Sequence, residues 1–229
     1  MRARELIAES EMSDDLAPYL RSKGYERLGD IGADAQAFLE PGTGLVLKIF
    51  GTRTGSGAKP GELTRDQWIF TKYVDYCQAN ANNPFLPQFS GWERFEFFGE
   101  YYLMIRVERL FPYHNIYWGH FLESMADQAK LRNDKEAKKK FVETIMRYDW
   151  NRTGSDDWDE KADSPYQNFG VEMLTHLGMK KFNLLWDTIH DLATIARNGG
   201  FRLDLHEGNF MLGSDGEIVI NDPFWSGRF

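Results

Sequence analysis

Three oxygen-bearing side chains near the end of the sequence have a spacing that suggests chemistry on phosphate groups. Asp204, Asn209 and Asp222 lie in the stretch DLHEGNFMLGSDGEIVINDPF, in which the apolar runs FML and EIVI are separated by the turn residues GSDG. Two such runs around a turn predict a hairpin, and a hairpin returns its two ends to one place. We therefore expect Asn209, just before the first strand, and Asp222, just after the second, to face the same point. Each is an ordinary turn residue when taken singly, so the prediction rests on their combination.

These residue types fit a division of labour between a metal and a hydroxyl group. Amide and carboxylate oxygens suit Mg²⁺, which keeps several of its waters and also binds phosphate oxygens. Asp204, five residues before Asn209, is a carboxylate able to orient or deprotonate a hydroxyl. The pattern predicts that Asn209 and Asp222 hold the metal and that Asp204 acts on the nucleophile.

The first half of the sequence must supply the elements that position any partner of these residues. The strand candidates AQAFLE and GLVLKIF flank the turn signal PGTG, and an earlier strand ends at Leu28. LTRDQWIFTKYVDYCQ predicts a helix with Trp68 and Tyr73 near one face, and PQFSGWERFEFF and EYYLMIRVERL predict two further strands. A helix is also expected over residues 4–23. Residues 1–108 are thus predicted to form mainly an antiparallel sheet, with Lys48 on one of its strands.

The second half is predicted to be mainly helical. HFLESMADQAKL and DKEAKKKFVETIMRYDW are amphipathic, and FGVEMLTHLG and MKKFNLLWDTIHDLATIARNGG predict helices that lead to the motif segment, the last one capped by Gly199 and Gly200. Between them lies an acidic break, NRTGSDDWDEKADSPYQ. The expected fold class is α+β, a single domain over residues 1–229 with an N-terminal lobe over 1–108 and a C-terminal lobe over 109–229.

Composition limits the partners and the compartment. The 229 residues carry a net charge of −8, which argues against nucleic acid or an anionic membrane surface as the main partner. Cys77 is the only cysteine, so neither an intrachain disulfide nor a cysteine-based zinc site can form. No run of about 18 apolar residues and no secretory signal is present in the sequence, so we expect no membrane span and a cytoplasmic location.

The motif segment resembles the catalytic loop and the metal loop of the protein-kinase-like superfamily. There an Asp, an Asn five residues later and the Asp of a DFG motif carry out these tasks. This chain has RLDLHEGN where HRDLKPEN would stand and NDPF where DFG would stand. DLHxGN is similar to atypical kinases of the aminoglycoside-phosphotransferase type, and DLHEGNFML…VINDPF is similar to small Ser/Thr protein kinases encoded by bacteriophages. The resemblance covers roughly residues 25–224, with its motifs in about thirty of them.

The resemblance implies a two-lobed fold and further residues that bind ATP. Lys48 would contact the α- and β-phosphates, and a glycine turn would cover them. The acid that usually holds this lysine would be Glu62 or Asp66, of which Asp66 is favoured because it lies inside the helix pattern. The backbone of Glu108 and its neighbours would pair with the adenine edge. The implied turn residues are Gly29, Gly32 and Ala33, with Ala35 standing where a third glycine is expected.

The acceptor is open between several classes. The phage-kinase resemblance favours a protein Ser/Thr hydroxyl, and the aminoglycoside-kinase resemblance favours a small hydroxylated molecule. The sequence ends seven residues after Asp222, so the activation segment and late helices of ordinary protein kinases are expected to be missing. A pseudokinase that serves as a binding or scaffold module is a further alternative, because the glycine turn is poor and the HRD His and Arg are missing. Transfer of AMP in place of phosphate is another.

Two simpler interpretations compete with parts of this scheme. A lysine within an apolar strand can protect an exposed sheet edge, so Lys48 alone would be weak support. The glycine-rich stretch GTRTGSGAKPG invites a phosphate-loop interpretation, but Ala58 separates Gly57 from Lys59, and Pro60 stands where Ser or Thr should hold the metal. We expect that stretch to be a connector.

Overall fold

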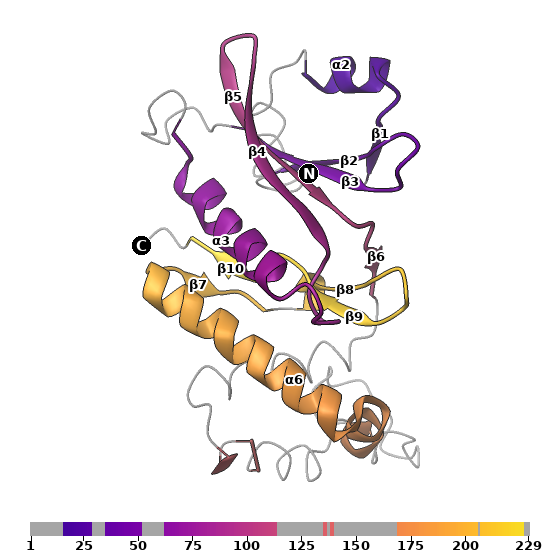
Figure 1. Cartoon of the computed structure of the whole chain (residues 1–229), viewed down its shortest axis with the longest axis vertical. Helices are drawn as coiled ribbons and strands as arrows, with labels where there is room; N and C mark the ends of the chain where they lie inside the picture. The colour runs from indigo at the N-terminus through magenta and orange to yellow at the C-terminus, as the bar shows by residue number, and fades with distance from the viewer. Residues whose placement is uncertain are drawn as a thin grey trace, which may run out of the picture. The chain divides into compact units, whose positions relative to one another are not determined.

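The computed structural model describes residues 16–28, 35–51, 62–113, 135–136, 138–139, 169–205 and 207–226. Within these ranges the fold is α+β, with an antiparallel sheet and three α-helices (Figure 1), which confirms the expected class. The chain forms two compact units, residues 1–112 together with 211–229, and residues 113–210. The division near residue 108 was expected, but the last hairpin groups with the sheet and not with the helical unit.

The first unit is built on a five-stranded sheet in the order β1-β2-β3-β5-β4. Every pairing in it is antiparallel, and β3 is the central strand. The PGTG turn joins β2 to β3 as expected, with Gly42 and Gly44 at positive φ. The strands are β1 (Glu26–Leu28), β2 (Gln36–Leu39), β3 (Val46–Phe50), β4 (Phe89–Phe97) and β5 (Glu100–Val107).

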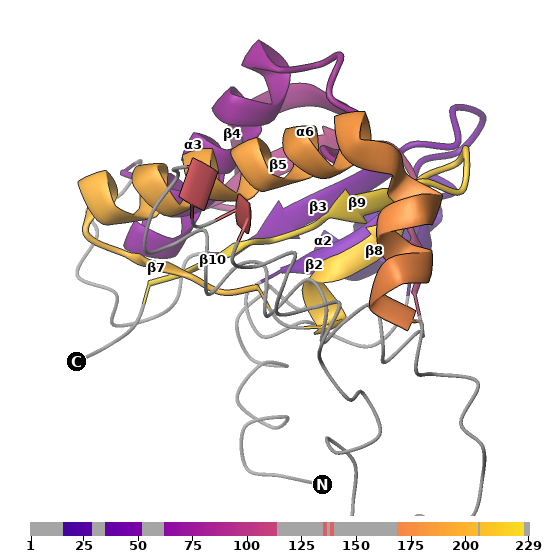
Figure 2. The same ribbon diagram turned by 90° about the horizontal axis from the view of Figure 1, so that it is seen from below.

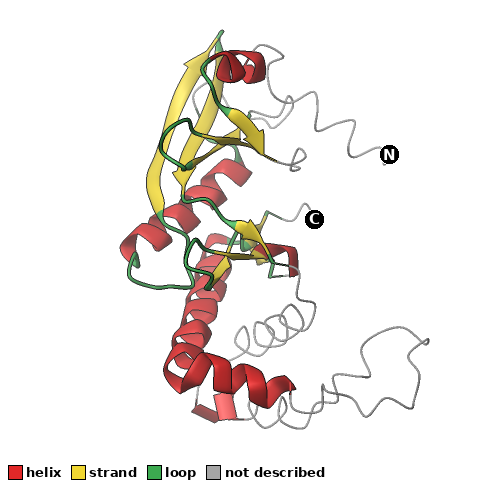
Figure 3. Ribbon diagram, turned by 90° about the vertical axis from the view of Figure 1, so that its right-hand side faces the viewer, coloured by secondary structure: helices red, strands yellow, loops and turns green. Residues whose placement is uncertain are grey.

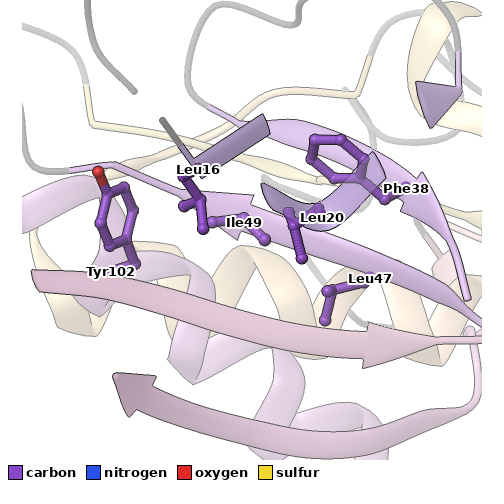
Figure 4. Packing of buried hydrophobic residues seen from close by; sticks show 6 residues of the cluster. All are labelled: Leu16, Leu20, Phe38, Leu47, Ile49 and Tyr102. Carbon is purple, nitrogen blue, oxygen red and sulfur yellow. The ribbon is translucent and has the colours of Figure 1, made fainter. Parts of the chain in front are cut away.

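Alternation along β3 divides the packing between two faces of the sheet. Leu47 and Ile49 are buried on the face covered by helix α2 (Leu16–Ser22), where they pack with Leu16, Leu20 and Phe38 (Figure 4). Lys48 and Phe50 therefore project from the other face, which is covered by helix α3 (Arg65–Ala79). The helix expected over residues 4–23 is described only as α2, because its first part lies outside the described residues.

Helix α3 begins with a capping box and is tied to the end of β3. The Thr64 side chain accepts a hydrogen bond from the Gln67 N–H at 3.2 Å, and the Gln67 side chain accepts one from the Thr64 N–H at 3.0 Å. The Gln67 amide also donates to the carbonyls of Phe50 and Gly51 at 3.3 and 3.2 Å. Trp68, predicted near the apolar face, is 39% exposed. The buried face is formed by Gln67, Ile69, Phe70, Thr71, Tyr73, Val74 and Cys77.

A tight turn at Phe98 and Gly99 joins β4 to β5. Both residues have positive φ, 50° and 81°, which is the backbone of a type I′ hairpin turn. Phe97 pairs with Glu100 across the turn, and Phe98 is 81% exposed. This hairpin extends beyond β3, because β3 pairs with β5 only from Leu103 to Val107 (Figure 1).

The last part of the first unit is the predicted hairpin. Strands β8 (Phe210–Leu212) and β9 (Ile218–Ile220) are neighbours in a three-stranded sheet (Figure 2), and β6 (Phe111–Pro112) pairs with β8. The turn between them closes with the Gly213 N–H donating to the Glu217 carbonyl at 2.9 Å. Strand β10 (Phe224–Trp225) follows and contacts α3.

Helix α6 (Phe169–Gly199) is the main described element of the second unit, together with β7 (Arg202–Leu203) and the 3₁₀ turn η2 (Glu207–Asn209). Gly178 interrupts α6 with φ 69° and ψ 156°, so the two predicted helices meet at a kink (Figure 3). Gly200 follows with φ 67°, and the Phe201 N–H donates to the Ala196 carbonyl at 3.0 Å, so the expected glycine cap is confirmed. Most of the two helices predicted within residues 120–150 lies outside the described residues.

Within the described part of the chain, no helix is both long enough and apolar enough to cross a membrane.

Candidate functional site

An ion pair joins Lys48 to Asp222 within the first unit. Lys48 Nζ lies 3.0 Å from Asp222 Oδ2, although the two residues are 174 positions apart in the sequence. The Lys48 side chain is 20% exposed and that of Asp222 is 40% exposed. An ion pair this exposed contributes only about 0.2–1 kcal/mol to stability. The contribution of the ion pair to stability is therefore too small to explain why a lysine occupies the central strand of the sheet.

The topology also decides against the simpler interpretation of Lys48. Strand β3 has β2 on one side and β5 on the other, so it has no exposed edge to protect. The interpretation of Lys48 as an edge-protecting residue is wrong. Its side chain leaves the sheet toward α3 and the segment after β9, where its amine meets a carboxylate.

On the α3 side, the Lys48 amine meets the Phe70 ring and not the acid that was expected to hold it. Lys48 Nζ lies 4.2 Å from the centre of the Phe70 ring and 5.2 Å from that of Phe50. Cation–π contacts of this kind contribute about 0.5–2 kcal/mol, depending on solvent access. Among the described residues Lys48 forms no ion pair with Glu62 or Asp66, so the favoured partner, Asp66, is replaced by Asp222.

Asp222 has a backbone conformation that non-glycine residues rarely adopt. Its φ is 51°, in the left-handed region, where Asp and Asn are tolerated better than other residues. The conformation still costs on the order of 1–2 kcal/mol and persists only when the surroundings enforce it. Strained residues of this kind cluster at functional sites. The strain marks Asp222 as a residue whose carboxylate direction matters.

Tyr73 of α3 contacts the chain on both sides of Asp222. Its hydroxyl donates to the Ile220 carbonyl, and its ring meets the Phe224 ring edge-on at 5.9 Å. The Ile220 N–H donates in turn to the Phe85 carbonyl at 2.9 Å. Burial raises the pKa of Tyr73 well above its ordinary value, and the Cys77 and Asp222 side chains add to this. The Tyr73 hydroxyl therefore remains a donor at neutral pH.

Asp204 and Asn209 lie together within the second unit. The Asn209 side-chain N–H donates to the Asp204 backbone carbonyl at 2.6 Å. This bond fixes which way the amide faces, because only its nitrogen can donate to a carbonyl. The Asn209 Oδ1 atom is then left as an acceptor or a metal ligand. Both side chains are half-buried, with Asn209 at the end of η2.

Glu108 lies directly after β5, at the end of the sheet. Its N–H donates to the Gln88 carbonyl at 3.0 Å, and its side chain accepts from the Gln88 N–H at 2.9 Å. The Glu108 N–H is therefore not available to a ligand. Within the described residues, its carbonyl and the N–H of Leu110 have no hydrogen-bond partner.

Several predicted residues lie outside the described part of the chain. These are Gly29, Gly32 and Ala33 of the phosphate-covering turn, together with His206 of the DLHEGN motif. Ala35, at the end of that turn, is described and directly precedes β2.

The described residues offer oxygen ligands for Mg²⁺ singly and not as a cluster. No group of three or more His, Cys, Asp or Glu side chains suited to a metal occurs among them. Mg²⁺ binds through one or two carboxylates, keeps several waters and takes the remaining ligands from phosphates. In the first unit, the Oδ1 atom of Asp222 is not engaged by Lys48. In the second unit, the Oδ1 atom of Asn209 is left when its nitrogen bonds to Asp204. Each residue taken by itself therefore offers an oxygen of the kind that Mg²⁺ binds.

Comparison of the sequence with protein-family models and with curated proteins finds no match.

Sequence reasoning missed two residues of the site. Phe70 and Tyr73 are three positions apart on α3, the spacing that places side chains on one helical face. An aromatic pair at this spacing ordinarily indicates core packing, and both residues are buried. What distinguishes them is the Lys48 amine over one ring and the Ile220 carbonyl on the hydroxyl of the other, contacts that depend on the tertiary fold.

Proposed function

We propose that this protein is an ATP-dependent phosphotransferase with a protein-kinase-like two-lobed fold. The observation that carries the proposal is the Lys48–Asp222 ion pair at 3.0 Å, formed between a central strand and a strained aspartate 174 residues later. Lys48 neutralises charge on the ATP phosphates, and Asp222 provides a carboxylate for the metal that accompanies them. Both roles need the Lys48 and Asp222 side chains close to each other, and the two lie in contact.

The remaining residues take roles that follow from their bonding. The Asn209 Oδ1 atom is the second protein ligand proposed for Mg²⁺, which when bound would neutralise phosphate charge. The adenine edge offers one donor next to one acceptor, which the Glu108 carbonyl and the Leu110 N–H would complement. Gly29, Gly32 and Ala33 remain the proposed phosphate-covering turn.

The transfer itself relies on position and charge. Asp204 orients the acceptor hydroxyl and takes up its proton as the hydroxyl oxygen bonds to the γ-phosphorus. The bond from that phosphorus to the bridging oxygen breaks, and ADP leaves. Catalysis of this kind needs little covalent chemistry from the protein. We propose a protein Ser/Thr hydroxyl as the acceptor, with a small hydroxylated molecule as the alternative.

One observation favours a second candidate, a pseudokinase that binds nucleotide without transferring phosphate. Lys48 is held on the α3 side by the Phe70 ring and not by a carboxylate. A neutral ring fixes the amine less strongly than an ionised acid, so the lysine is less well oriented toward phosphates. The measurement of transfer separates the two candidates.

The first experiment is the thermal unfolding midpoint with and without Mg²⁺–ATP. We expect a rise of about 5 °C or more at a nucleotide concentration of 100 Kd. Asp222→Asn keeps a residue that tolerates the left-handed backbone but removes the charge, so it should fold and lose the rise. Asp66→Asn is the matched control and should keep the rise, because Lys48 does not pair with Asp66. Loss of the rise in Asp66→Asn alone would contradict the assignment of Asp222.

The second experiment uses ATP labelled on the γ-phosphate. Wild-type protein is incubated alone, with cell lysate and with hydroxylated small molecules such as aminoglycosides. Labelled protein supports the protein acceptor, and labelled small molecules with unlabelled lysate support the alternative. A nucleotide-dependent thermal shift with no transfer to any acceptor would favour the pseudokinase. No thermal shift with Mg²⁺–ATP would overturn the nucleotide site.

A further inference from the structure

Tyr73 bonds to one side of Asp222 and packs against the other. Two residues before Asp222, the Ile220 carbonyl accepts a hydrogen bond from the Tyr73 hydroxyl. Two residues after it, the Phe224 ring lies edge-on to the Tyr73 ring, with centroids 5.9 Å apart. Both contacts come from one side chain that is fully buried in α3. The short segment from Ile220 to Phe224 is therefore attached to the helix at both ends.

Other contacts make this attachment rigid. The Ile220 N–H donates to the Phe85 carbonyl, so both backbone groups of Ile220 are bonded to the first unit. The Tyr73 ring also meets Phe70 and Phe89, at 6.0 and 5.7 Å. A buried hydroxyl must find a partner, and the Tyr73 hydroxyl donates to the backbone two residues ahead of the strained aspartate.

We propose that Tyr73 is the positioning residue that holds Asp222 in its left-handed conformation and so directs the carboxylate toward Lys48 and the metal. This inference rests on the proposed function. Phe70 shares the same helix face and sets the position of the Lys48 amine, while Tyr73 sets that of the carboxylate. Two aromatic residues three positions apart thus place both members of the ion pair.

The test uses Tyr73→Phe, which keeps the ring and removes only the hydroxyl. We expect the Kd for Mg²⁺–ATP to rise about tenfold, while the Kd for ATP in excess EDTA changes little. If Tyr73 had only a structural role, Tyr73→Phe would raise the Kd for Mg²⁺–ATP and the Kd for ATP in EDTA by the same factor. Phe89→Leu is the matched control, because Phe89 packs edge-on against the Tyr73 ring and leaves the hydrogen bond from the Tyr73 hydroxyl to the Ile220 carbonyl in place. It should lower the unfolding midpoint but leave the ratio of the two Kd values unchanged.

A double-mutant cycle tests whether Tyr73 acts through Asp222. In the Asp222→Asn background, Tyr73→Phe should have no further effect on the Kd for Mg²⁺–ATP, because the carboxylate that it directs is gone. Additive effects of the two substitutions would overturn the inference. So would a Tyr73→Phe variant whose ratio of Kd values equals that of wild type.

A measurement without nucleotide keeps this inference separate from the proposed function. Amide hydrogen exchange at Asp222 and Phe224 should become at least tenfold faster in Tyr73→Phe and less so in Phe89→Leu. Unchanged exchange would overturn the positioning role even if ATP binds. If exchange is faster in Tyr73→Phe but the wild-type protein binds no Mg²⁺–ATP, Tyr73 still holds the segment, and the metal and nucleotide role of Asp222 is rejected.

Discussion

At the scale of single residues, the site depends on which atom of each polar group is already engaged. Asn209 has its nitrogen bonded to the Asp204 carbonyl, which leaves its oxygen for a ligand. Asp222 gives one oxygen to Lys48 and keeps the other. Glu108 has its N–H engaged and its carbonyl without a partner among the described residues. The proposed binding of Mg²⁺–ATP would use these half-engaged groups.

Asp204→Asn separates binding from transfer at this scale. The Asp204 contact to Asn209 is made by its backbone carbonyl, so the substitution leaves that bond in place. We expect the Kd for Mg²⁺–ATP to change less than about threefold, while transfer falls by about 10²–10⁴-fold, the usual contribution of a positioned general base. Isothermal titration and γ-phosphate labelling measure the two quantities. An equal loss of binding would assign Asp204 to the nucleotide and not to the acceptor.

At the scale of elements, the turn between β4 and β5 places an aromatic residue where Asn, Asp or Gly is preferred. Phe98 has φ 50° and is 81% exposed, so it bears the strain of the left-handed region without burial to compensate. Phe98→Asn should raise the free energy of unfolding by about 0.5–1 kcal/mol, as measured by urea denaturation. Gly99→Ala is the control, and it should change the free energy of unfolding in the opposite direction. Gly99 has φ 81° with no atom near an added Cβ, so its substitution should lower stability through backbone strain alone.

If Phe98→Asn lowers stability, the edge-on contact of the Phe98 ring with the Phe97 ring, with centroids 4.6 Å apart, outweighs the backbone strain. If Gly99→Ala is neutral, the turn is not held in the type I′ conformation.

The elements were also the level at which sequence patterns were most informative. Apolar alternation and turn residues predicted β2, β3, β4, β5 and the β8–β9 hairpin, because these signals are local. The glycine cap of α6 was found for the same reason. The short strands β6, β7 and β10 carry two residues each and have no recognisable period. Trp68 was misplaced on α3 because the buried face is decided by which side packs on the sheet.

The candidate site was predicted only in part. The hairpin pattern placed Asp222 after β9, and the resemblance linked it to Lys48, which lies against it. The preference for Asp66 failed because nothing local in the sequence reports that Phe70 faces the Lys48 amine. Such contacts join residues far apart in the sequence, and only the folded chain reveals them.

At the scale of the whole molecule, the buried thiol and phenol groups of α3 make the protein less stable as the pH rises above 9. Burial raises the pKa of the Cys77 thiol from its ordinary value of 9.0 to about 12, with a smaller opposing effect of its hydrogen bond with the Tyr73 side chain. The pKa of Tyr73 is raised as well. Above pH 9 the unfolded chain loses the thiol proton while the folded protein keeps it. The contribution to stability is therefore complete below pH 9 and is lost as the pH rises toward 12.

Urea denaturation at pH 8, 9, 10 and 10.5 measures this dependence. The free energy of unfolding should fall by up to about 1.4 kcal/mol per pH unit for each such group. In Cys77→Ala the free energy of unfolding should fall less between pH 9 and 10 than in wild type. Above pH 10 it should still fall, because Tyr73 remains. A wild-type curve that is level from pH 8 to 10.5 would show that neither group is buried in solution.

Residues 211–226 complete a unit whose other part is residues 16–112, and this has a consequence for synthesis. On the ribosome the sheet and α3 emerge early. The carbonyl that Tyr73 bonds is made 147 residues after Tyr73, and the carboxylate that pairs with Lys48 is made 174 residues after Lys48. During that interval the nascent chain exposes the part of α3 that β10 later contacts. Chaperone binding to the nascent chain should accordingly begin once α3 has left the exit tunnel and end once residues 211–226 have emerged and packed against it.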